Sequence, residues 1–368
     1  MRTVIPCLVT ATLLALGAAA QEPVPMKLEP LPFRVPAPAD NPTTRDKVVL
    51  GRLLFFDPVL SATKTVACAT CHHPEHGWAD ARATPIGAGG IGLGPARRMV
   101  HGGDIRVLAR NVPTLLNVGF NGLVAGDKTD ASAAPMFWDA SVLGLEAQVF
   151  KPLQSADEMR GTAGSEAAAM AQAVSRVQTI PEYRERFAKC LGEVTGKHLA
   201  QAIAAFERTL VASDSPFDRF MRGDKEALSP KQQCGMQAFE KAGCTFCHGG
   251  PMFSDFKLHF IGVPDERREF RTPTLRNLRH TAPYMHNGSQ RTLQEVMVFY
   301  EQLMDTVSET VDGGDKTAVP PLDPLLRRLA FSVDDEPDLI AFLDSLNDDS
   351  YDKTIPKQVP SGLKVAGE

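Results

Sequence analysis

The chain has 368 residues, with 39 basic and 44 acidic side chains and a formal net charge of −5. This mildly acidic balance, without a basic stripe, argues against nucleic acid or an anionic membrane surface as a partner. A length of this size, less its end segments, suits two domains.

The first 20 residues have the pattern of a secretory signal. Arg2 supplies a positive charge, an apolar stretch follows from Leu8 to Leu16, and small residues end at Ala20, where we expect cleavage. The apolar stretch is too short to span a bilayer. We therefore expect export to a bacterial periplasm and no membrane span.

Residues 21–44 are rich in proline and are expected to be extended. Beyond them the helical patterns are strong, and the strand patterns are few. The predicted fold is mainly α, with two cytochrome c-like haem domains and long loops: an N-terminal domain at 45–212, a C-terminal domain at 213–350 and a tail at 351–368. The segment 214–224 is predicted to connect the two domains.

Local signals predict five particular helices. Ser229 and Pro230 are typical of a helix start, and Thr292 with Glu295 forms a capping box. Pro181 should interrupt one helical run. The expected helices cover 166–190 with that break, 198–211, 231–242, 292–304 and 336–346.

Two pentapeptides carry the chemistry. Both follow the C-x-x-C-H pattern of covalent c-type haem attachment: Cys68 and Cys71 with His72, and Cys244 and Cys247 with His248. In this pattern the two thiols add to the haem vinyl groups and the histidine ligates the iron. A zinc site fits poorly, because the following histidines lack the usual spacing. We therefore predict two covalently bound c-type haems.

Cys190 and Cys234 lie outside these motifs. In an oxidising compartment they either form a disulfide or remain as two buried small apolar side chains, and the sequence does not decide between these outcomes. His73 and His76, just after the first motif, are expected to face solvent.

Residues 45 to 350 resemble the bacterial di-haem cytochrome c peroxidase family, which includes MauG. The matching stretches are 51–58 (GRLLFFDP), 110–114 (RNVPT), 137–139 (FWD), 205–210 (AFERTL), 215–218 (SPFD), 271–277 (RTPTLRN), 281–288 (TAPYMHNG) and both haem motifs. The resemblance implies two cytochrome c-like domains with a calcium ion between them.

In this family the first haem is where hydrogen peroxide reacts. The family's distal Gln and Glu stand ten and twenty residues after a tryptophan, and these steps from Trp138 reach Gln148 and Glu158. By resemblance, Glu158 is the general acid and base, Gln148 orients the peroxide and Trp138 carries electrons or holes between the haems. The calcium ligands carry over onto Asn111, Thr281 and Pro283, the last two through their carbonyls.

The distal ligand of the second haem separates the subgroups of the family. Ordinary members have a methionine nineteen residues after the position of Thr281, whereas MauG-like members have a tyrosine, and this chain has Tyr300. A phenolate favours high oxidation states of iron. Met297 and Met304, one helical turn away on either side, remain alternative ligands.

Two positions depart from the family. MauG uses a tryptophan two residues before the second haem motif, where this chain has Ala242. The reversible histidine ligand of the first haem in many peroxidases has no counterpart at its usual distance. His101, in a long Gly/Arg loop, remains a candidate, but we expect a five-coordinate first haem.

The sequence thus predicts a periplasmic di-haem oxidoreductase that reacts hydrogen peroxide at the first haem. Its partner is either a small periplasmic electron donor, a cytochrome c or a cupredoxin, or a protein whose side chain is oxidised in the manner of MauG. A di-haem electron carrier is the non-enzyme alternative. Some family members are dimers, so a homodimer remains open.

Overall fold

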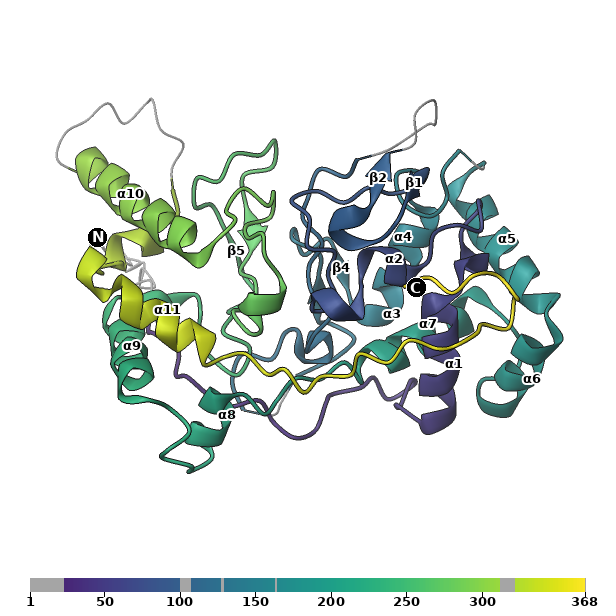
Figure 1. Ribbon diagram of the computed structural model, residues 1–368, viewed down its shortest axis with the longest axis horizontal. Helices are drawn as coiled ribbons and strands as arrows, with labels where there is room; N and C mark the ends of the chain where they lie inside the picture. The colour runs from purple at the N-terminus through teal and green to yellow at the C-terminus, as the bar shows by residue number, and fades with distance from the viewer. Residues whose placement is uncertain (1–22, 100–106, 127–128, 163, 312–321, 368) are drawn as a thin grey trace, which may run out of the picture.

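The computed structural model describes residues 23–99, 107–126, 129–162, 164–311 and 322–367. It shows a mainly helical molecule with two lobes side by side (Figure 1). The predicted signal segment and His101 lie outside the described residues. Within the described ranges no helix is both long and apolar enough to cross a bilayer.

The first lobe contains seven helices and four short strands among the described residues. They are α1 (Arg45–Phe56), α2 (Cys68–Cys71), β1 (Gly90–Ile91), β2 (Arg98–Met99), β3 (Pro135–Met136), β4 (Val142–Leu143), α3 (Leu145–Gln148), α4 (Phe150–Gln154), α5 (Glu166–Gln178), α6 (Pro181–Cys190) and α7 (Gly196–Glu207). The second lobe contains α8 (Pro216–Met221), α9 (Pro230–Lys241), β5 (Leu258–His259), β6 (Phe270–Arg271), α10 (Leu293–Val311) and α11 (Glu336–Asp344). The strands form antiparallel pairs β1–β2, β3–β4 and β5–β6.

The predicted helices are present, with bounds shifted by a few residues. Ser229 caps α9 and forms a capping box with Gln232. The backbone N–H of Glu295 donates to the Thr292 hydroxyl at 3.1 Å, as a capping box at the start of α10 requires. Pro181 begins α6 at its first position, so the expected break separates α5 from α6. Helix α10 runs seven residues further than expected, to Val311.

Each lobe contains a pair of helices that cross at a glycine, a shared feature that the sequence does not reveal. A Cβ on Gly51 of α1 would lie 1.9 Å from the carbonyl oxygen of Ala202 in α7, and one on Gly235 of α9 would lie 1.8 Å from that of Asp338 in α11. Only glycine permits so close a crossing of two backbones.

Each lobe also contains an asparagine with a left-handed backbone that forms a similar hydrogen bond. Asn117 and Asn277 both have a left-handed backbone with a φ of 62°. The Asn117 amide oxygen accepts a hydrogen bond from the N–H of Ala212 at 2.8 Å, and that of Asn277 accepts one from Asp348 at 2.9 Å. Each asparagine therefore ties a loop to the segment that follows the last helix of its lobe.

The first and last described segments of the chain each pack on the lobe that is farther from them in the sequence. The proline-rich segment is extended, and its Leu28 is buried in the core of the second lobe. The backbone N–H of Met26 donates to the Thr245 carbonyl at 2.9 Å, beside the second haem motif. The tail leaves the second lobe and runs across the first (Figure 1), where Val359 and Val365 are buried in the core.

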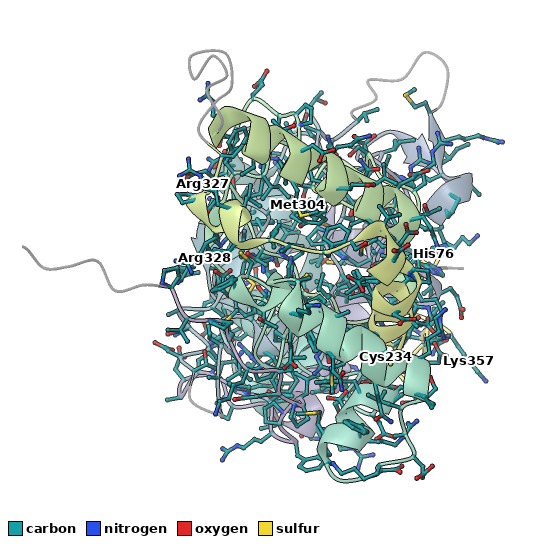
Figure 2. The ribbon with its side chains drawn as sticks, turned by 90° about the vertical axis from the view of Figure 1, so that its left-hand side faces the viewer. His76, Cys234, Met304, Arg327, Arg328 and Lys357 are labelled. Atoms are coloured by element: carbon teal, nitrogen blue, oxygen red, sulfur yellow. The ribbon has the colours of Figure 1, made fainter. Side chains whose placement is uncertain are left out.

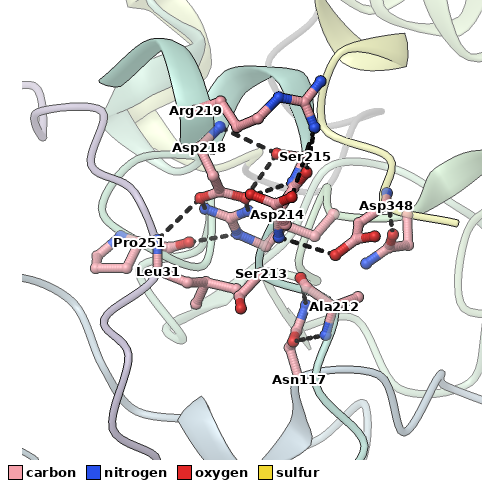
Figure 3. A network of polar contacts seen from close by, with 12 residues as sticks. Leu31, Asn117, Ala212, Ser213, Asp214, Ser215, Asp218, Arg219, Pro251 and Asp348 are labelled. Atoms are coloured by element: carbon pink, nitrogen blue, oxygen red, sulfur yellow. Dashed lines mark hydrogen bonds and ion pairs between the residues drawn. The ribbon is translucent and has the colours of Figure 1, made fainter. Parts of the chain in front are cut away.

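A polar network lies where the segment 214–224 joins the lobes (Figure 3). Asp218 of α8 accepts hydrogen bonds from Nη1 and Nη2 of Arg276 at 2.8 and 3.1 Å, and from the N–H of Leu31 at 3.0 Å. Both charged side chains are almost completely buried. The predicted connection is thus a folded junction rather than a loose linker.

Candidate active site

One cavity of about 770 Å³ extends between the two lobes. Both haem motifs line it through their cysteines and histidines, at positions 68, 71 and 72 and at 244, 247 and 248. The other residues expected at the site line the same cavity: Gln148, Glu158, Trp138, Tyr300, Asn111, Thr281 and Pro283. Folding therefore brings the proposed haem, peroxide and calcium residues to one cavity, whereas the alternative ligand Met304 is not part of its lining.

The two motif histidines are held in the same way. Nδ1 of His72 donates to the Trp78 carbonyl at 3.0 Å, and Nδ1 of His248 donates to the Phe253 carbonyl at 3.0 Å. A protonated Nδ1 leaves Nε2 with a free lone pair, as an iron ligand needs. Burial also lowers the pKa of His72, to about 4, which keeps the ring neutral. Together with the free cysteines of each motif, these residues fit two haems.

Glu158 stands on the first motif's side of the cavity. Burial raises the pKa of the Cys68 thiol, and the nearby carboxylates of Glu207 and Glu158 raise it further, which shows that both acids lie close to this motif. Burial, followed by the charge of Asp157, raises the pKa of Glu158 to about 7. A carboxyl with such a pKa both accepts and donates protons near neutral pH.

The backbone around Glu158 is fixed by the loop before β1. A Cβ on Gly87 would lie 1.7 Å from the carbonyl oxygen of Asp157, so this close approach requires glycine. The N–H of Ala88 donates to the same oxygen at 3.2 Å. Arg97, which is buried, holds the loop by donating to the carbonyls of Ile86 and Gly87 at 2.6 and 2.7 Å.

Trp138 lies where the lobes meet. Its Nε1 donates to the Asn111 carbonyl at 2.8 Å within the first lobe. The second lobe holds its backbone, because the N–H of Arg271 donates to the Trp138 carbonyl at 2.6 Å. The indole ring packs edge-on against His286 of the second lobe, with ring centres 6.4 Å apart. Gln148, at the end of α3, lines the cavity from the first lobe.

The three expected calcium ligands also lie between the lobes. The side-chain Nδ2 of Asn111 donates to the Arg82 carbonyl at 2.8 Å, so the amide oxygen is the side-chain atom that could bind a cation. Thr281 and Pro283 approach from the second lobe and line the same cavity. Oxygen donors from a side-chain amide and two backbone carbonyls suit a hard cation such as Ca²⁺.

Tyr300 stands on the second motif's side. Burial raises its pKa, and the charges of the nearby Cys247 and Cys244 raise it further, so the phenol lies near these cysteines. Met297 also lines the cavity, whereas Met304 does not belong to its lining. Met304 lies further along α10, on the face shown in Figure 2.

Three cysteine and histidine expectations need correction. Cys190 and Cys234 are both free. Cys190 is half-buried in the first lobe, and Cys234 is exposed on α9 of the second (Figure 2), so they are neither a disulfide nor a buried pair. His73 is buried rather than solvent-facing, because its Nε2 contacts the Gly367 carbonyl of the tail at 3.1 Å.

Glu207 is a cavity residue that the sequence analysis did not single out. It is buried, with 4% of its surface exposed, and its Oε2 has no hydrogen-bond partner. Burial raises its pKa to about 8. Helical spacing does reveal it, since Leu199 and Ile203 precede it by eight and four residues on the buried face of α7.

A second such residue is His259, which lines the cavity beside Cys247. Its Nδ1 and Nε2 contact Asp323 and Asp255 at 2.6 and 2.9 Å. Burial opposes a charge on this ring, yet the hydrogen bonds to Asp255 and its neighbours raise the pKa of His259 to about 11. The second motif therefore has this imidazolium near it, whereas the buried cation that acts on Cys71 of the first motif is Arg97.

Comparisons with known proteins agree with this geometry. The family model "Di-haem cytochrome c peroxidase" matches residues 45–226. The methylamine utilization protein MauG of Methylophilus methylotrophus is 33% identical over 86% of this chain and 87% of its own length. The chain belongs to the di-haem cytochrome c peroxidase family.

Relatives that are named as cytochrome c peroxidases are also similar to this chain. Cytochrome c551 peroxidase of Nitrosomonas europaea is 30% identical, with coverage of 89% of this chain and 87% of the relative. Among solved structures, a MauG-like protein associated with microbial copper homeostasis superposes with a TM-score of 0.67 at 28% identity, covering 87% of this chain and 95% of the other. The chain is therefore a haem peroxidase by family, and haem is its cofactor.

Proposed function

We propose that this family member is a periplasmic di-haem c-type enzyme that reacts hydrogen peroxide at the haem of the first motif. Cys68 and Cys71 hold that haem covalently and His72 ligates its iron, while Cys244, Cys247 and His248 do the same for the second. The observation that carries the proposal is the asymmetry of one shared cavity, with Glu158 beside the first motif and Tyr300 beside the second.

Bound haem would supply the iron centre whose electrons reduce the O–O bond of peroxide. The chain's own residues handle the proton. Glu158 takes the proton from the peroxide oxygen nearer the iron and delivers it to the outer oxygen, which can then leave as water. Gln148 orients the peroxide by hydrogen bonding. The closely packed loop at Gly87 supports Glu158 from behind and limits its movement.

Trp138 and Tyr300 serve the second half of the proposal. Trp138 contacts groups of both lobes and so provides a path for electrons or holes between the two haems. Tyr300, as a hard anionic ligand, would close the second iron and stabilise its oxidised states. A calcium ion held by Asn111, Thr281 and Pro283 would fix the spacing of the lobes.

Tyr300 favours a MauG-like reaction, in which oxidising equivalents are stored and then used on a side chain of a partner protein. Its exit route would differ from the one at the MauG tryptophan. Ala242 occupies that position, is 2% exposed, and its carbonyl accepts the N–H of Ala330 at 3.1 Å. A cytochrome c peroxidase that takes electrons from a small cytochrome or cupredoxin is the second candidate, favoured by this buried alanine.

A single experiment separates these functions. The ferric protein is mixed with hydrogen peroxide, with and without a reduced small cytochrome c. Rapid oxidation of the cytochrome supports the plain peroxidase. A long-lived oxidised state with slow cytochrome turnover supports the MauG-like reaction. Two low-spin irons that do not react with peroxide would instead indicate an electron carrier.

A further inference from the structure

Glu207 has no assigned role in the proposed reaction, yet it is an acid buried in the cavity that both haem motifs line. It lies at the last position of α7. Its surface is 4% exposed, and no residue in the described part of the chain forms a hydrogen bond with its Oε2. A buried polar atom without a partner is unfavourable, and more so if it is charged, so a native protein rarely keeps one without a use.

None of the described residues donates a hydrogen bond to Oε2 of Glu207. The neighbouring Arg208 donates from Nη2 to Glu146 of α3 at 2.6 Å, and its Nε and Nη1 likewise have no hydrogen-bond partner in the described part of the chain. The charge of Arg208 lowers the pKa of Glu207, and that of Glu146 raises it, but both effects are smaller than that of burial. Cys68 of α2 becomes a thioether when haem is attached and then cannot titrate. Glu158 is the other nearby cavity acid.

An electron entering the first haem adds a negative charge to this buried space. An ionised Glu207 would oppose that charge, and in a medium of low dielectric constant the repulsion is large. A proton on Glu207 removes the repulsion and also supplies the missing partner, because a protonated carboxyl can donate a hydrogen bond into the cavity.

We propose that Glu207 is a proton-holding residue of the first haem: its Oε2 takes up one proton from solvent when one electron enters that haem, and releases the proton when the electron leaves. Charge in the cavity then stays constant through each one-electron step. The inference rests on the proposed placement of the first haem at His72. Glu207 and Glu158 would have different roles. Glu207 would hold the proton that balances an electron on the haem, and Glu158 would transfer the proton of the peroxide.

The test is a redox titration of the haem-loaded protein with one-electron mediators, carried out at several pH values. One proton taken up per electron changes the equilibrium tenfold for each pH unit, which is about 59 mV for a one-electron couple. Because the pKa of Glu207 is about 8, its carboxyl is ionised before reduction only above that pH. Above about pH 8 we therefore expect the potential of the first, high-spin haem to fall with rising pH by up to this amount in the wild type. Glu207→Gln keeps the size and shape of the side chain. In this variant the slope, which is the change of haem potential per pH unit, should be at most half that of the wild type.

Two controls separate a proton-holding role from a structural one. Glu185→Gln removes an exposed acid of the same lobe and should leave the slope unchanged. The potential of the second, low-spin haem, measured in the same variant, serves as an internal reference. A wild-type potential that does not vary with pH, or a Glu207→Gln slope reduced by less than half, overturns the proposal.

A second measurement covers the case in which Glu207→Gln fails to load haem. The reduced-minus-oxidised infrared spectrum of the wild type should gain a protonated carboxyl band that shifts in deuterated water, and Glu207→Asp should retain a band of this kind. No carboxyl band in the wild type would refute the role of Glu207. Neither measurement uses peroxide, so failure of the peroxide reaction would count against the proposed function alone.

Discussion

Glu158 and Tyr300 line the same cavity, and each lies beside the cysteines of a different haem motif. The motifs themselves are alike, since both histidines donate through Nδ1 to a backbone carbonyl at 3.0 Å. The difference in chemistry between the two sites therefore comes from the opposite walls of the cavity, where an acid stands on one side and a phenol on the other.

Replacing Glu158 by Gln should slow the reaction with peroxide by roughly 10²- to 10⁴-fold, the usual effect of losing a general acid and base. Stopped-flow absorbance at the haem band measures this rate. Glu193→Gln, an exposed acid of the same lobe, is the control and should react normally. An unchanged rate in Glu158→Gln would remove Glu158 from the mechanism.

The carboxyl of Glu158 should also make the rate of the reaction with peroxide depend on pH. Burial raises the pKa of Glu158 to about 7, so its carboxylate form, which accepts the first proton of peroxide, increases as the pH rises through neutrality. The rate of the reaction with peroxide should therefore rise and then level off above about pH 8. Glu158→Gln should abolish this rise. A wild-type rate that falls over the same range would contradict the assignment.

Replacing Tyr300 by Phe should alter the low-spin magnetic resonance signal of the second haem, because the iron loses its proposed phenolate ligand. Met297→Leu is the matched control, since Met297 lines the same cavity one turn earlier on α10. If Met297→Leu changes the signal and Tyr300→Phe does not, methionine is the ligand and the MauG-like reading loses its main support.

Asn111→Ala should weaken calcium binding, measured by isothermal titration of the chelator-treated protein. The change removes the proposed side-chain oxygen ligand and keeps the backbone carbonyl that accepts the Trp138 indole N–H. Asn121→Ala, a buried asparagine of the same lobe outside the proposed calcium set, is the control. Equal calcium affinity in both variants would exclude a site at Asn111.

Asp218→Ala should lower the free energy of unfolding by roughly 3–5 kcal/mol, because the guanidinium of Arg276 would stay buried without its partner. The control is Arg219→Ala, which breaks an exposed ion pair with Asp214 and should cost less than about 1 kcal/mol. Urea unfolding of the two variants measures the difference. Equal losses would mean that the junction does not depend on the buried pair.

The local signals in the sequence were sufficient for the helices, and the residues proposed for the site line one cavity. Ser229, Thr292 and Pro181 act through hydrogen bonds and ring geometry within a few residues of themselves, so their effects are readable from the sequence alone. The site residues were reached through fixed spacings from Trp138 and Thr281, which carry tertiary information only because the family resemblance supplies it.

The missed features depend on contacts between distant residues. Gly51 and Gly235 look like ordinary helical glycines until the crossing helices α7 and α11 are in place. Likewise, the spacing of Glu207 places it on the buried face of its helix, but the sequence cannot show that no described residue donates a hydrogen bond to its Oε2. The separation of Cys190 from Cys234 is a property of the two-lobe arrangement and not of either segment.

The path of the tail links the last residues of the chain to the first haem site. The carbonyl of Asp352 accepts the indole N–H of Trp78 at 3.0 Å, and the carbonyl of Trp78 in turn holds Nδ1 of His72. During synthesis His72 emerges well before Asp352, so its support is complete only when the chain is finished. A protease that trims the C-terminus would therefore damage the first haem site while sparing the second, although the second motif is nearer in sequence.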